Sequence, residues 1–349
     1  MKGWMVVEAK QPLEDVELPT PVPTGSEVLI EVTHCGVCHS DLHFWKGEYN
    51  MGGGVIMKLA ERGVELPRAP GHEVVGRVAG LGPDASGAAI GDLRVVYPWL
   101  GCGTCADCTN ERDNMCLMGR AIGIVRHGGF ASHVVVPHAR YLMDPGEVDP
   151  ALAATYACSG ITCYSAVSKI MPLEADKPVL VIGAGGVGLL MIAMLRAFGH
   201  RNIISVDLEA AKRQAAHDAG ATHVIDGASD GLAARINAAC GPVAAAIDCV
   251  NSESTASAAL DALGKGGKLV LVGVAGGILK ISLSAMIFRS QNVLGNLTGS
   301  PADLRAVLKL ANAGKLQPTP ITLCPHEQAN QVLLDLKAGK VTGRAVLVR

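Results

Sequence analysis

The sequence predicts an α/β protein with two parts, a β-rich barrel and a doubly wound parallel sheet. The length of 349 residues is enough for two hydrophobic cores. Up to about residue 150, short alternating apolar segments are interrupted by Gly and Pro, a pattern typical of a barrel with long loops. From about residue 175, continuous apolar strands alternate with helical stretches, which predicts right-handed crossovers and a parallel sheet.

The composition excludes several classes of partner. Hydrophobic residues make up 49% of the chain but aromatic residues only 3%, so we expect cores of Val, Ile, Leu and Ala. No apolar run approaches the roughly twenty residues that a membrane span needs. The net charge is −2 and basic residues do not cluster, so we expect neither a membrane nor a nucleic acid as partner. Eleven cysteines without a secretory leader favour a cytoplasmic location.

The individual elements follow from local apolar patterns. In the first part, the patterns predict strands at Glu27–Val32, Val74–Val78 and Ser132–Pro137. In the second part, they predict helices at Leu189–Phe198 and Glu209–Ala219. The strands predicted around these helices are Val179–Ile182, Ile203–Val206, His223–Ile225, Ala244–Ile247, Lys268–Val272 and Val293–Leu294. After about residue 298 we expect one helix and a final strand, Arg344–Val348.

Four cysteines lie within fifteen residues; they are Cys102, Cys105, Cys108 and Cys116. Thiolates at this spacing can converge on one tetrahedral ion, and four protein ligands leave no open position, so we expect a structural zinc. Disulfides suit small secreted proteins, and a thioredoxin-like pair lies at a strand–helix junction instead of a polar loop. An iron–sulfur site usually has a shorter last gap and often a Pro after the fourth cysteine, where this chain has Leu117.

The predicted strand Val179–Ile182 leads directly into a glycine-rich turn. The turn contains Gly183, Gly185, Gly186 and Gly188 in the pattern GxGxxG, and a predicted helix follows it. A lone GxGxxG is weak evidence, but the strand, the helix and an acidic residue 19 positions after the last glycine supply the expected context. Glycines permit close backbone approach and the helix N-terminus favours the charge of a pyrophosphate, so we expect a dinucleotide here.

Asp207 is that acidic residue, and it favours NAD over NADP. Its carboxylate can accept hydrogen bonds from the adenosine ribose hydroxyls, whereas a 2′-phosphate would be repelled. The next residue, Leu208, supplies no compensating cation. A role as helix N-cap would be compatible with this assignment.

Three further fragments carry metal-binding side chains. The first, CGVCHSDLH, spans Cys35–His43; the second is Gly71–Glu73; the third, CSGITCY, spans Cys158–Tyr164. Each alone would be unremarkable, because a single buried His or Cys is more often structural, as we expect for Cys35. Together with the four cysteines, the glycine-rich turn and the terminal Gly343–Arg344, they resemble in type and order the zinc-dependent medium-chain alcohol dehydrogenases, over the full length of the chain.

The resemblance implies a division of the chain into two domains. Residues 1–155 and 298–349 would form a GroES-like catalytic domain, with the structural zinc lobe at about 98–120. Residues 156–297 would form a Rossmann coenzyme-binding domain inserted between them. A homodimer or, more in keeping with bacterial family members of this length, a homotetramer is implied, with Val293–Leu294 as the edge strand through which the sheets join.

The resemblance also implies two zinc ions per chain, the second of them catalytic. The family has a Cys₂His catalytic site, which by motif position corresponds to Cys38, His72 and Cys158, with the fourth position left for water or the substrate oxygen. A zinc ion lowers the pKa of a hydroxyl that binds to it, which alcohol oxidation near neutral pH requires.

The resemblance assigns roles to residues around this zinc. Ser40 and His43 match the family's proton relay, although a histidine in a solvated loop would also explain His43. Asp41 matches the carboxylate that orients the ligand histidine, and Glu73 matches a carboxylate that can approach the metal.

Further residues are implied to contact NAD. His39 and Arg344 would meet the pyrophosphate, and Lys212 the adenosine ribose. Thr162 and Val187 would pack against the nicotinamide. The coenzyme-binding set is completed by Val250 and Val272.

The substrate is expected to be a small-molecule alcohol or carbonyl compound, of medium size and hydrophobic, primary or secondary. By position, the pocket would be lined by Trp45, Tyr49, Trp99 and Leu297, the last closing its outer end, although the tryptophans could instead fill core. The loop 50–68 is longer than we expect for the family, and we expect it to act as a lid over the entrance. Its hinge would be Gly52–Gly54, and its apolar face would consist of Val55, Ile56, Met57 and Leu59.

Four alternatives compete with this interpretation. A zinc-free quinone reductase of the same superfamily would lack the ligands, and a polyol dehydrogenase commonly has Glu where this chain has Cys158. An NADP-preferring reductase of the cinnamyl-alcohol type is disfavoured by Asp207. A non-catalytic sensor that binds zinc and NAD would need no proton relay, so an NADH-absorbance assay with simple alcohols separates it from an enzyme.

Overall fold

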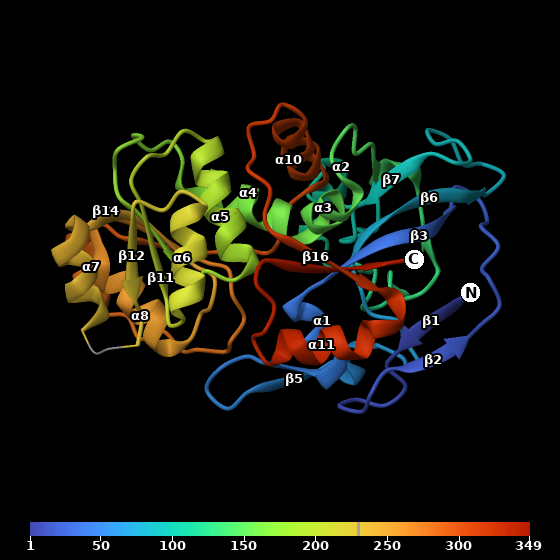
Figure 1. Ribbon diagram of the computed structural model, residues 1–349, viewed down its shortest axis with the longest axis horizontal. Helices are drawn as coiled ribbons and strands as arrows, with labels where there is room; N and C mark the ends of the chain where they lie inside the picture. The colour runs from blue at the N-terminus through green and yellow to red at the C-terminus, as the bar shows by residue number, and fades with distance from the viewer. Residues whose placement is uncertain (229–230) are drawn as a thin grey trace.

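Two sheets organise the chain, and Figure 1 shows them side by side along the long axis of the molecule. The computed structural model describes residues 1–228 and 231–349. The sheet on the left of Figure 1 is parallel and lies within 179–295, whereas the sheet on the right combines strands from both ends of the chain. We name these parts the parallel-sheet half and the mixed-sheet half.

The parallel sheet confirms the predicted doubly wound fold. Within the described residues it has six strands in the order β12-β11-β10-β13-β14-β15, so the order reverses direction at β10. The strands are β10 (Val179–Ile182), β11 (Ile203–Asp207), β12 (His223–Asp226), β13 (Val243–Asp248), β14 (Leu263–Leu271) and β15 (Asn292–Gly295). The helices of this half are α5 (Gly186–Ala197), α6 (Ala210–Asp218), α7 (Leu232–Cys240), α8 (Glu253–Ala262) and α9 (Leu283–Arg289).

Strand β10 explains why helices cover both faces of this sheet. Its residues Val179 and Val181 belong to the large core that includes α5, whereas Leu180 and Ile182 belong to a second core with side chains of α7 and α8. Successive strand residues point to opposite faces, so one continuous apolar strand supplies both cores. Burial of each aliphatic side chain stabilises the fold by about 1.5–3 kcal/mol. A strand with apolar side chains on both faces is therefore most stable at the centre of the sheet.

The mixed sheet is built around strand β3. Its order is β16-β17-β3-β6-β7-β9, and β8 also pairs with β3. The strands are β3 (Val28–Val37), β6 (Glu73–Leu81), β7 (Leu93–Val96), β8 (His133–Val136), β9 (Leu142–Met143), β16 (Ile321–Pro325) and β17 (Arg344–Val348). Separate two-stranded sheets are formed by β1 (Lys2–Met5) with β2 (Glu14–Glu17), and by β4 (Glu48–Asn50) with β5 (Ile56–Lys58).

The remaining helices surround this sheet and the junction between the halves. They are α1 (His39–Lys46), α2 (Ala106–Thr109), α3 (Pro150–Thr155), α4 (Ile161–Ile170), α10 (Pro301–Asn312) and α11 (Ala329–Lys337). Short turns of helix are η1 (Ala60–Arg62), η2 (Asp113–Met115), η3 (Ala139–Tyr141), η4 (Tyr156–Gly160) and η5 (His326–Gln328). In the part of the chain that is described, none of the helices combines the length and apolar composition needed to cross a membrane.

The predicted content of the C-terminal segment is wrong. After residue 298 the chain forms two helices, α10 and α11, and an additional strand, β16, before the final strand. Strand β16 is an edge strand with mostly exposed or half-buried residues, so its sequence lacks the apolar run that predicted the other strands. The final strand itself, β17, has the predicted bounds.

Pairing between the two ends of the chain positions the functional residues. Strand β17 runs antiparallel to β3, with Ala345 opposite Val37 and Val348 opposite His34. The observed β3 is longer than predicted and ends at Val37, one residue before Cys38. The start of the last strand therefore lies beside the first predicted zinc ligand.

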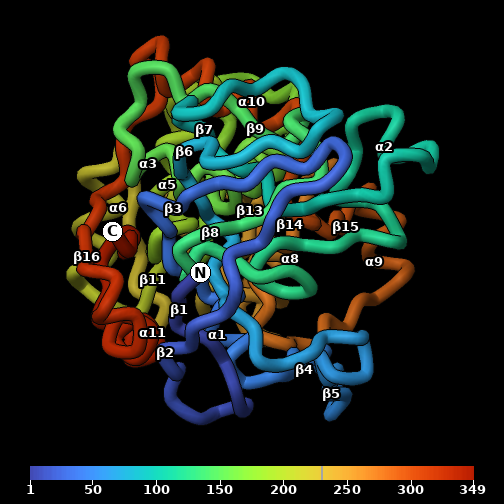
Figure 2. Tube along the Cα trace, turned by 90° about the vertical axis from the view of Figure 1, so that its right-hand side faces the viewer, coloured from blue at the N-terminus to red at the C-terminus, as the bar shows by residue number. Residues whose placement is uncertain are grey.

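The predicted lid is an ordered hairpin of β4 and β5 followed by η1, seen at the lower right of Figure 2. Val55 and Ile56 are exposed, as a lid face would require. Leu59 does not belong to that face, because its side chain is buried in the core of the mixed-sheet half.

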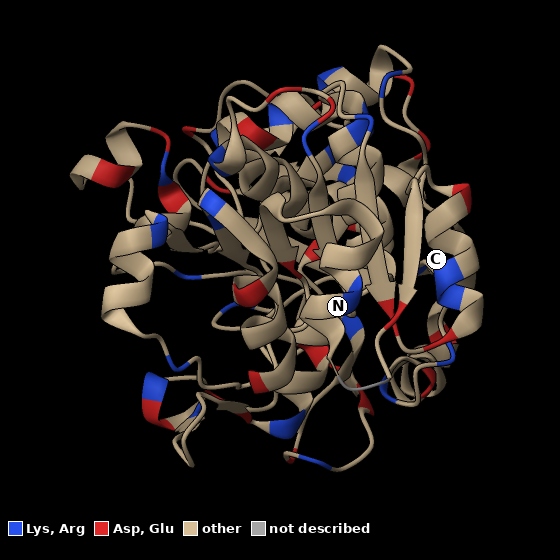
Figure 3. Cartoon of the chain, turned by 90° about the vertical axis from the view of Figure 1, so that its left-hand side faces the viewer, with Lys and Arg blue, Asp and Glu red and all other residues tan. Residues whose placement is uncertain are grey.

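The charged residues are distributed over the surface of the parallel-sheet half. Figure 3 shows Lys and Arg interspersed with Asp and Glu over this side of the molecule. This distribution agrees with the near-neutral net charge of −2 and gives no support for a nucleic-acid partner.

Candidate metal and dinucleotide site

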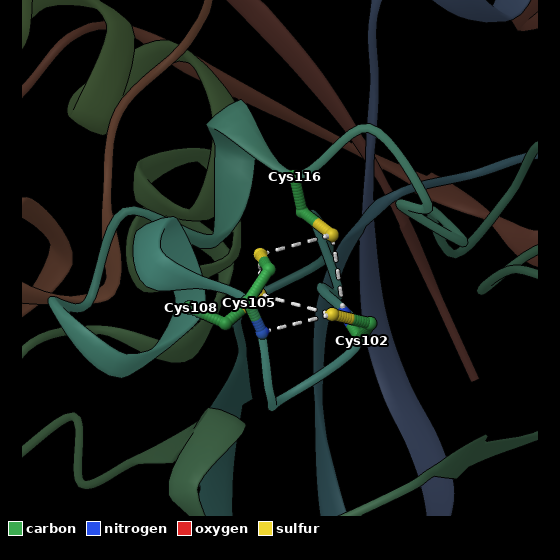
Figure 4. A group of neighbouring side chains, drawn as sticks. All are labelled: Cys102, Cys105, Cys108 and Cys116. Carbon is green, nitrogen blue, oxygen red and sulfur yellow. Dashed lines mark hydrogen bonds between the residues drawn. The ribbon is translucent and has the colours of Figure 1, made fainter.

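The four clustered cysteines converge in a lobe that projects beside α2 (Figures 2 and 4). The Sγ–Sγ distances are 3.5 Å between Cys105 and Cys108, 3.9 Å between Cys102 and Cys108, and 3.9 Å between Cys105 and Cys116. Four sulfurs at about 2.3 Å from one zinc ion would lie about 3.8 Å apart, so the donor set fits zinc. The backbone N–H groups of Cys102 and Cys105 donate to sulfurs of the same set, as negatively charged thiolates favour.

Polar contacts anchor this lobe to the rest of the molecule. The buried carboxylate of Asp113 accepts hydrogen bonds from Arg140 and from Tyr141, the latter at 2.8 Å. The Asn114 side chain donates to the carbonyl of Leu297 at 2.8 Å. Leu297, predicted to close the alcohol pocket, has a side chain that is 60% exposed, so its predicted role stays a prediction.

A second cluster brings together Cys38, His72, Glu73 and Cys158, with all four donor atoms within 4.8 Å of one another and all four residues buried. Cys38 follows β3, His72 and Glu73 lie at the start of β6, and Cys158 lies in η4. Among the described residues, Nε2 of His72 has no hydrogen-bond partner. A buried imidazole nitrogen without a partner beside two thiols is the arrangement that a Cys₂His zinc site requires.

Asp41 holds two of these ligands in place. One carboxylate oxygen accepts the N–H of Cys38 at 2.8 Å, and the other accepts the N–H of Gly71 at 2.9 Å. The second oxygen also lies 3.4 Å from Nδ1 of His72. Burial by itself lowers the pKa of His72, but the Asp41 charge and hydrogen bond raise it overall. Asp41 therefore directs Nε2 of the imidazole toward the two sulfurs.

Cys158, a predicted zinc ligand, lies in a turn of π-helix, Tyr156–Gly160, between α3 and α4. Such turns occur frequently at functional sites because they change the direction of one side chain within a continuous helical segment. The hydroxyl of Ser159 donates to the carbonyl of Thr155 at 2.7 Å inside this turn. The sequence offers no periodic signal for a π-turn, and we did not predict it.

Glu73 and Arg344 form a buried ion pair next to the second cluster. Arg344 also donates to the carbonyl of Val37 at 3.2 Å. Burial raises the pKa of Glu73 to about 7, with the Arg344 charge acting in the opposite direction. A Cβ atom placed on Gly186 would lie 2.4 Å from Cδ of Arg344, so the arginine side chain is packed against the glycine-rich turn.

The glycine-rich turn connects β10 to α5 as predicted. Gly183 has φ +90°, and a Cβ atom on Gly188 would lie 1.8 Å from the carbonyl oxygen of Gly183. By contrast, a Cβ atom on Gly185 would have nothing within 4 Å. The last glycine of the pattern, Gly188, is therefore required by the packing of the helix against the turn. The space at Gly185 is open, as close approach by a pyrophosphate requires.

Asp207 ends β11 and faces the glycine-rich turn. Its carboxylate accepts the N–H of Ala184 at 2.7 Å and the N–H of Glu209 at 3.0 Å. Together with Lys212 and Val250, it lines a cavity of about 670 Å³ at the carboxyl ends of the strands. This is where open α/β sheets bind their ligands.

Two cations lie near Asp207, one of which the sequence analysis missed. Lys212 pairs with Glu209 at 2.6 Å. Arg213 donates to the carbonyl oxygens of Asp207 and Leu208 and pairs with Asp226 at 3.2 Å. Arg213 lies six positions after Asp207, on the helix that follows β11, so the sequence could have shown that a cation lies close, although its charge is engaged by Asp226.

The predicted relay residues lie on α1, directly after Cys38. Ser40 and His43 are half-buried, and the imidazole of His43 stacks on Tyr49 with ring centroids 4.7 Å apart. Burial, followed by the charges of Lys46 and His39, lowers the pKa of His43. The imidazole is therefore neutral near pH 7 and able to accept a proton.

The remaining predicted coenzyme residues surround the turn. Thr162 is buried, and its carbonyl oxygen accepts a hydrogen bond from Asn296 at 3.2 Å. Val187 lies within the turn, between Gly186 and Gly188, and Val272 follows β14; both side chains are half-buried. His39 is exposed at the start of α1.

The two predicted pocket tryptophans have different surroundings. The Trp99 ring lies 5.4 Å from the His72 ring, so it borders the second cluster. The prediction for Trp45 is wrong: its indole N–H donates to the carbonyl of Gln11 at 2.6 Å and its ring contacts Lys337 of α11. Trp45 lies on the side of α1 that packs against α11, which helical spacing from Ser40 alone did not show.

The fold and the two sulfur-containing clusters define a zinc-binding dehydrogenase. Residues 24–145 match the model of the alcohol dehydrogenase GroES-like domain, and residues 186–313 match the model of zinc-binding dehydrogenases. The chain belongs to the family of zinc-dependent medium-chain alcohol dehydrogenases.

Relatives match over the full length. The chain is 37% identical to the NAD-dependent alcohol dehydrogenase of Sulfurisphaera tokodaii and 37% identical to that of Saccharolobus solfataricus, with 100% of each chain covered in both cases. Its fold is similar to the crystal structure of the alcohol dehydrogenase of Aeropyrum pernix, with a TM-score of 0.91, 28% identity and 100% of both chains covered.

Two alanine substitutions in the glycine-rich turn should have opposite consequences. Gly188→Ala places a methyl group against the Gly183 carbonyl and should destabilise the fold by about 1–3 kcal/mol, the usual result of overpacking. Gly185→Ala meets no protein atom and should leave the melting temperature unchanged, but it should weaken NAD binding by filling the open space. Differential scanning fluorimetry and NADH fluorescence titration measure the two effects; equal effects of both variants on stability would contradict the assignment.

Proposed function

We propose that this protein catalyses the reversible oxidation of a medium-sized hydrophobic primary or secondary alcohol to the aldehyde or ketone, with NAD as the hydride acceptor. The observation that carries this proposal is the buried Glu73–Arg344 pair, which joins the second cluster to the glycine-rich turn. Zinc held by Cys38, His72 and Cys158 would acidify the hydroxyl of the alcohol, and NAD would accept the hydride.

The residues around the cluster supply the remaining steps. Ser40 would receive the proton of the alcohol, and His43, half-exposed and neutral, would accept it in turn and release it to solvent. The carboxylate of Asp41 would keep the His72 ring in one orientation throughout. The half-buried indole of Trp99 would exclude water from one side of the reacting group.

The Asp207 carboxylate supports NAD as the preferred coenzyme. It lies in the cavity beside the glycine-rich turn, where it would accept hydrogen bonds from ribose hydroxyls and repel a 2′-phosphate. An NADP-preferring reductase is therefore the weaker alternative. A sensor without catalytic activity would not need the half-buried Ser40 and His43 next to the ligands.

We further propose that the domain boundaries follow the two halves, with residues 1–155 and 298–349 forming the catalytic domain and 156–297 the coenzyme domain. The strands of the mixed sheet before residue 155 and after residue 298 support this division. We also propose a cytoplasmic location, because none of the eleven cysteines, all of which lie in the described residues, forms a disulfide, as a reducing compartment favours.

A homotetramer built from dimers is the proposed assembly. Strand β15 is an edge of the parallel sheet, and neighbouring α9 exposes Leu283, Ile287 and Phe288 at 74%, 76% and 80%. An edge strand beside an apolar helix face is an aggregation hazard unless a second copy covers it.

Metal analysis should find two zinc ions per chain with separable roles. Cys158→Ala should lower the content to one zinc and abolish turnover while NADH fluorescence still reports coenzyme binding. Cys105→Ser should lower the melting temperature by about 5–10 °C, because structural zinc binding is coupled to folding. Cys324→Ser, outside both clusters, is the control and should keep both ions; one zinc, or iron, in the wild type would contradict the proposal.

Replacing Asp207 by Ser should change coenzyme choice. Loss of charged hydrogen bonds to the ribose should lower kcat/KM for NAD about 10- to 100-fold. The ratio of kcat/KM with NADP to kcat/KM with NAD should therefore rise. Asp218→Asn, on the exposed face of α6, is the matched control and should leave the ratio unchanged. Equal efficiency of the wild type with both coenzymes would refute the argument.

An alcohol panel followed by NADH absorbance tests the activity and the pocket together. Each buried methylene contributes about 0.8 kcal/mol, so the four additional methylenes of 1-hexanol should raise kcat/KM over that of ethanol by up to about 200-fold. Trp99→Ala should shift the preference toward bulkier cyclic and aromatic alcohols. Highest efficiency with ethanol would contradict the pocket, and no turnover with any alcohol in the presence of bound NAD would favour a sensor.

A further inference from the structure

Tyr49 lies where the proton relay, the second cluster and the junction between the halves meet. It belongs to β4, outside the motifs that carry the metal ligands. Its ring stacks on the His43 imidazole with centroids 4.7 Å apart and planes 21° apart. A near-parallel stack at this distance restricts rotation of the imidazole about its side-chain bonds.

The other end of the Tyr49 side chain reaches Ser40. The Ser40 hydroxyl lies near the phenol and acts to lower its pKa. Burial is the main cause that raises the pKa of the Tyr49 phenol, so the hydroxyl is neutral at physiological pH. The Tyr49 side chain therefore stacks on one residue predicted to transfer the proton and lies near the other, three positions away on α1.

The β4–β5 hairpin supports Tyr49 in this position. Tyr49 pairs with Met57 across the hairpin. At the turn, a Cβ atom on Gly52 would lie 2.9 Å from the carbonyl oxygen of Gly277, so the hairpin rests on the backbone of the parallel-sheet half. A cavity of about 200 Å³ lies at this contact, lined on one side by Tyr49 and on the other by residues that include Gly273.

We propose that Tyr49 is a positioning residue of the proton relay: its ring fixes the His43 imidazole, with the long hairpin serving as its support. The proposal rests on the proposed function, since it assigns Ser40 and His43 to proton transfer. It gives the hairpin a role at the relay itself, in addition to any role at the substrate entrance. The substitutions Tyr49→Phe and Tyr49→Leu separate the ring from the hydroxyl, because the first keeps the ring and the second removes both.

Steady-state kinetics with a small alcohol distinguish positioning from simple packing. Tyr49→Phe keeps the stacked ring and should retain kcat within about twofold, whereas Tyr49→Leu removes the ring and should lower kcat about 2- to 10-fold. The dissociation constant of NAD should change less than twofold in both, because Tyr49 is not among the residues that line the cavity beside Asp207. Tyr164→Phe, a tyrosine whose ring packs against Phe198, is the matched control and should retain the wild-type kcat.

A spectroscopic measurement tests the ring contact without turnover. In histidine-selective NMR spectra, the His43 ring signals, assigned through His43→Gln, should be shifted upfield by the stacked phenol. The shift should persist in Tyr49→Phe and disappear in Tyr49→Leu. Wild-type kcat in Tyr49→Leu, or His43 signals that are the same in all three proteins, would overturn the proposal. A wild type that is inert with every alcohol would contradict the proposed function instead, and the NMR comparison would still decide whether Tyr49 positions His43.

Discussion

The buried ion pair between Glu73 and Arg344 is the contact on which the geometry of the whole site depends. Arg344 begins the last strand, Glu73 begins β6, and the arginine side chain also packs against Gly186 of the glycine-rich turn. Removing one partner of such a pair leaves an uncompensated buried charge, at a cost of about 3–5 kcal/mol. The pair therefore fixes the distance between the metal ligands and the place where the dinucleotide would bind, and it does so from residues 271 positions apart.

The ligand cluster shows the same dependence on distant segments. Cys38, His72 and Cys158 each follow or interrupt a different element, and none of them is close to another in sequence. The single carboxylate of Asp41 connects the first two through backbone hydrogen bonds, and the π-turn orients the third. Different elements of the fold thus bring the two thiols and the imidazole that we predict as zinc ligands to one point, whereas the four cysteines of the lobe need only one local loop.

What the sequence could predict is what is encoded locally. The glycine-rich turn, the acidic end of β11 and the four-cysteine lobe each depend on residues within one supersecondary unit. The spacing of these residues in the sequence was therefore sufficient to predict them. The ligands from distant segments were proposed only through resemblance to a family, because no local pattern places Cys158 beside His72. The orientation of Trp45 toward α11, the exposed strand β16 and the packing of the hairpin on Gly277 depend on tertiary contacts that leave no periodic signal.

The most direct test of the account is zinc K-edge X-ray absorption on the purified wild-type protein. One site with four sulfurs and one with two sulfurs and two lighter ligands should give an average of about three sulfurs at about 2.3 Å and one nitrogen or oxygen at about 2.0–2.1 Å per zinc. Addition of a carbonyl-containing inhibitor with NADH should change only the lighter-ligand contribution. An average of four sulfurs would show that the Cys38–His72–Cys158 cluster holds no zinc, and would contradict the central claim.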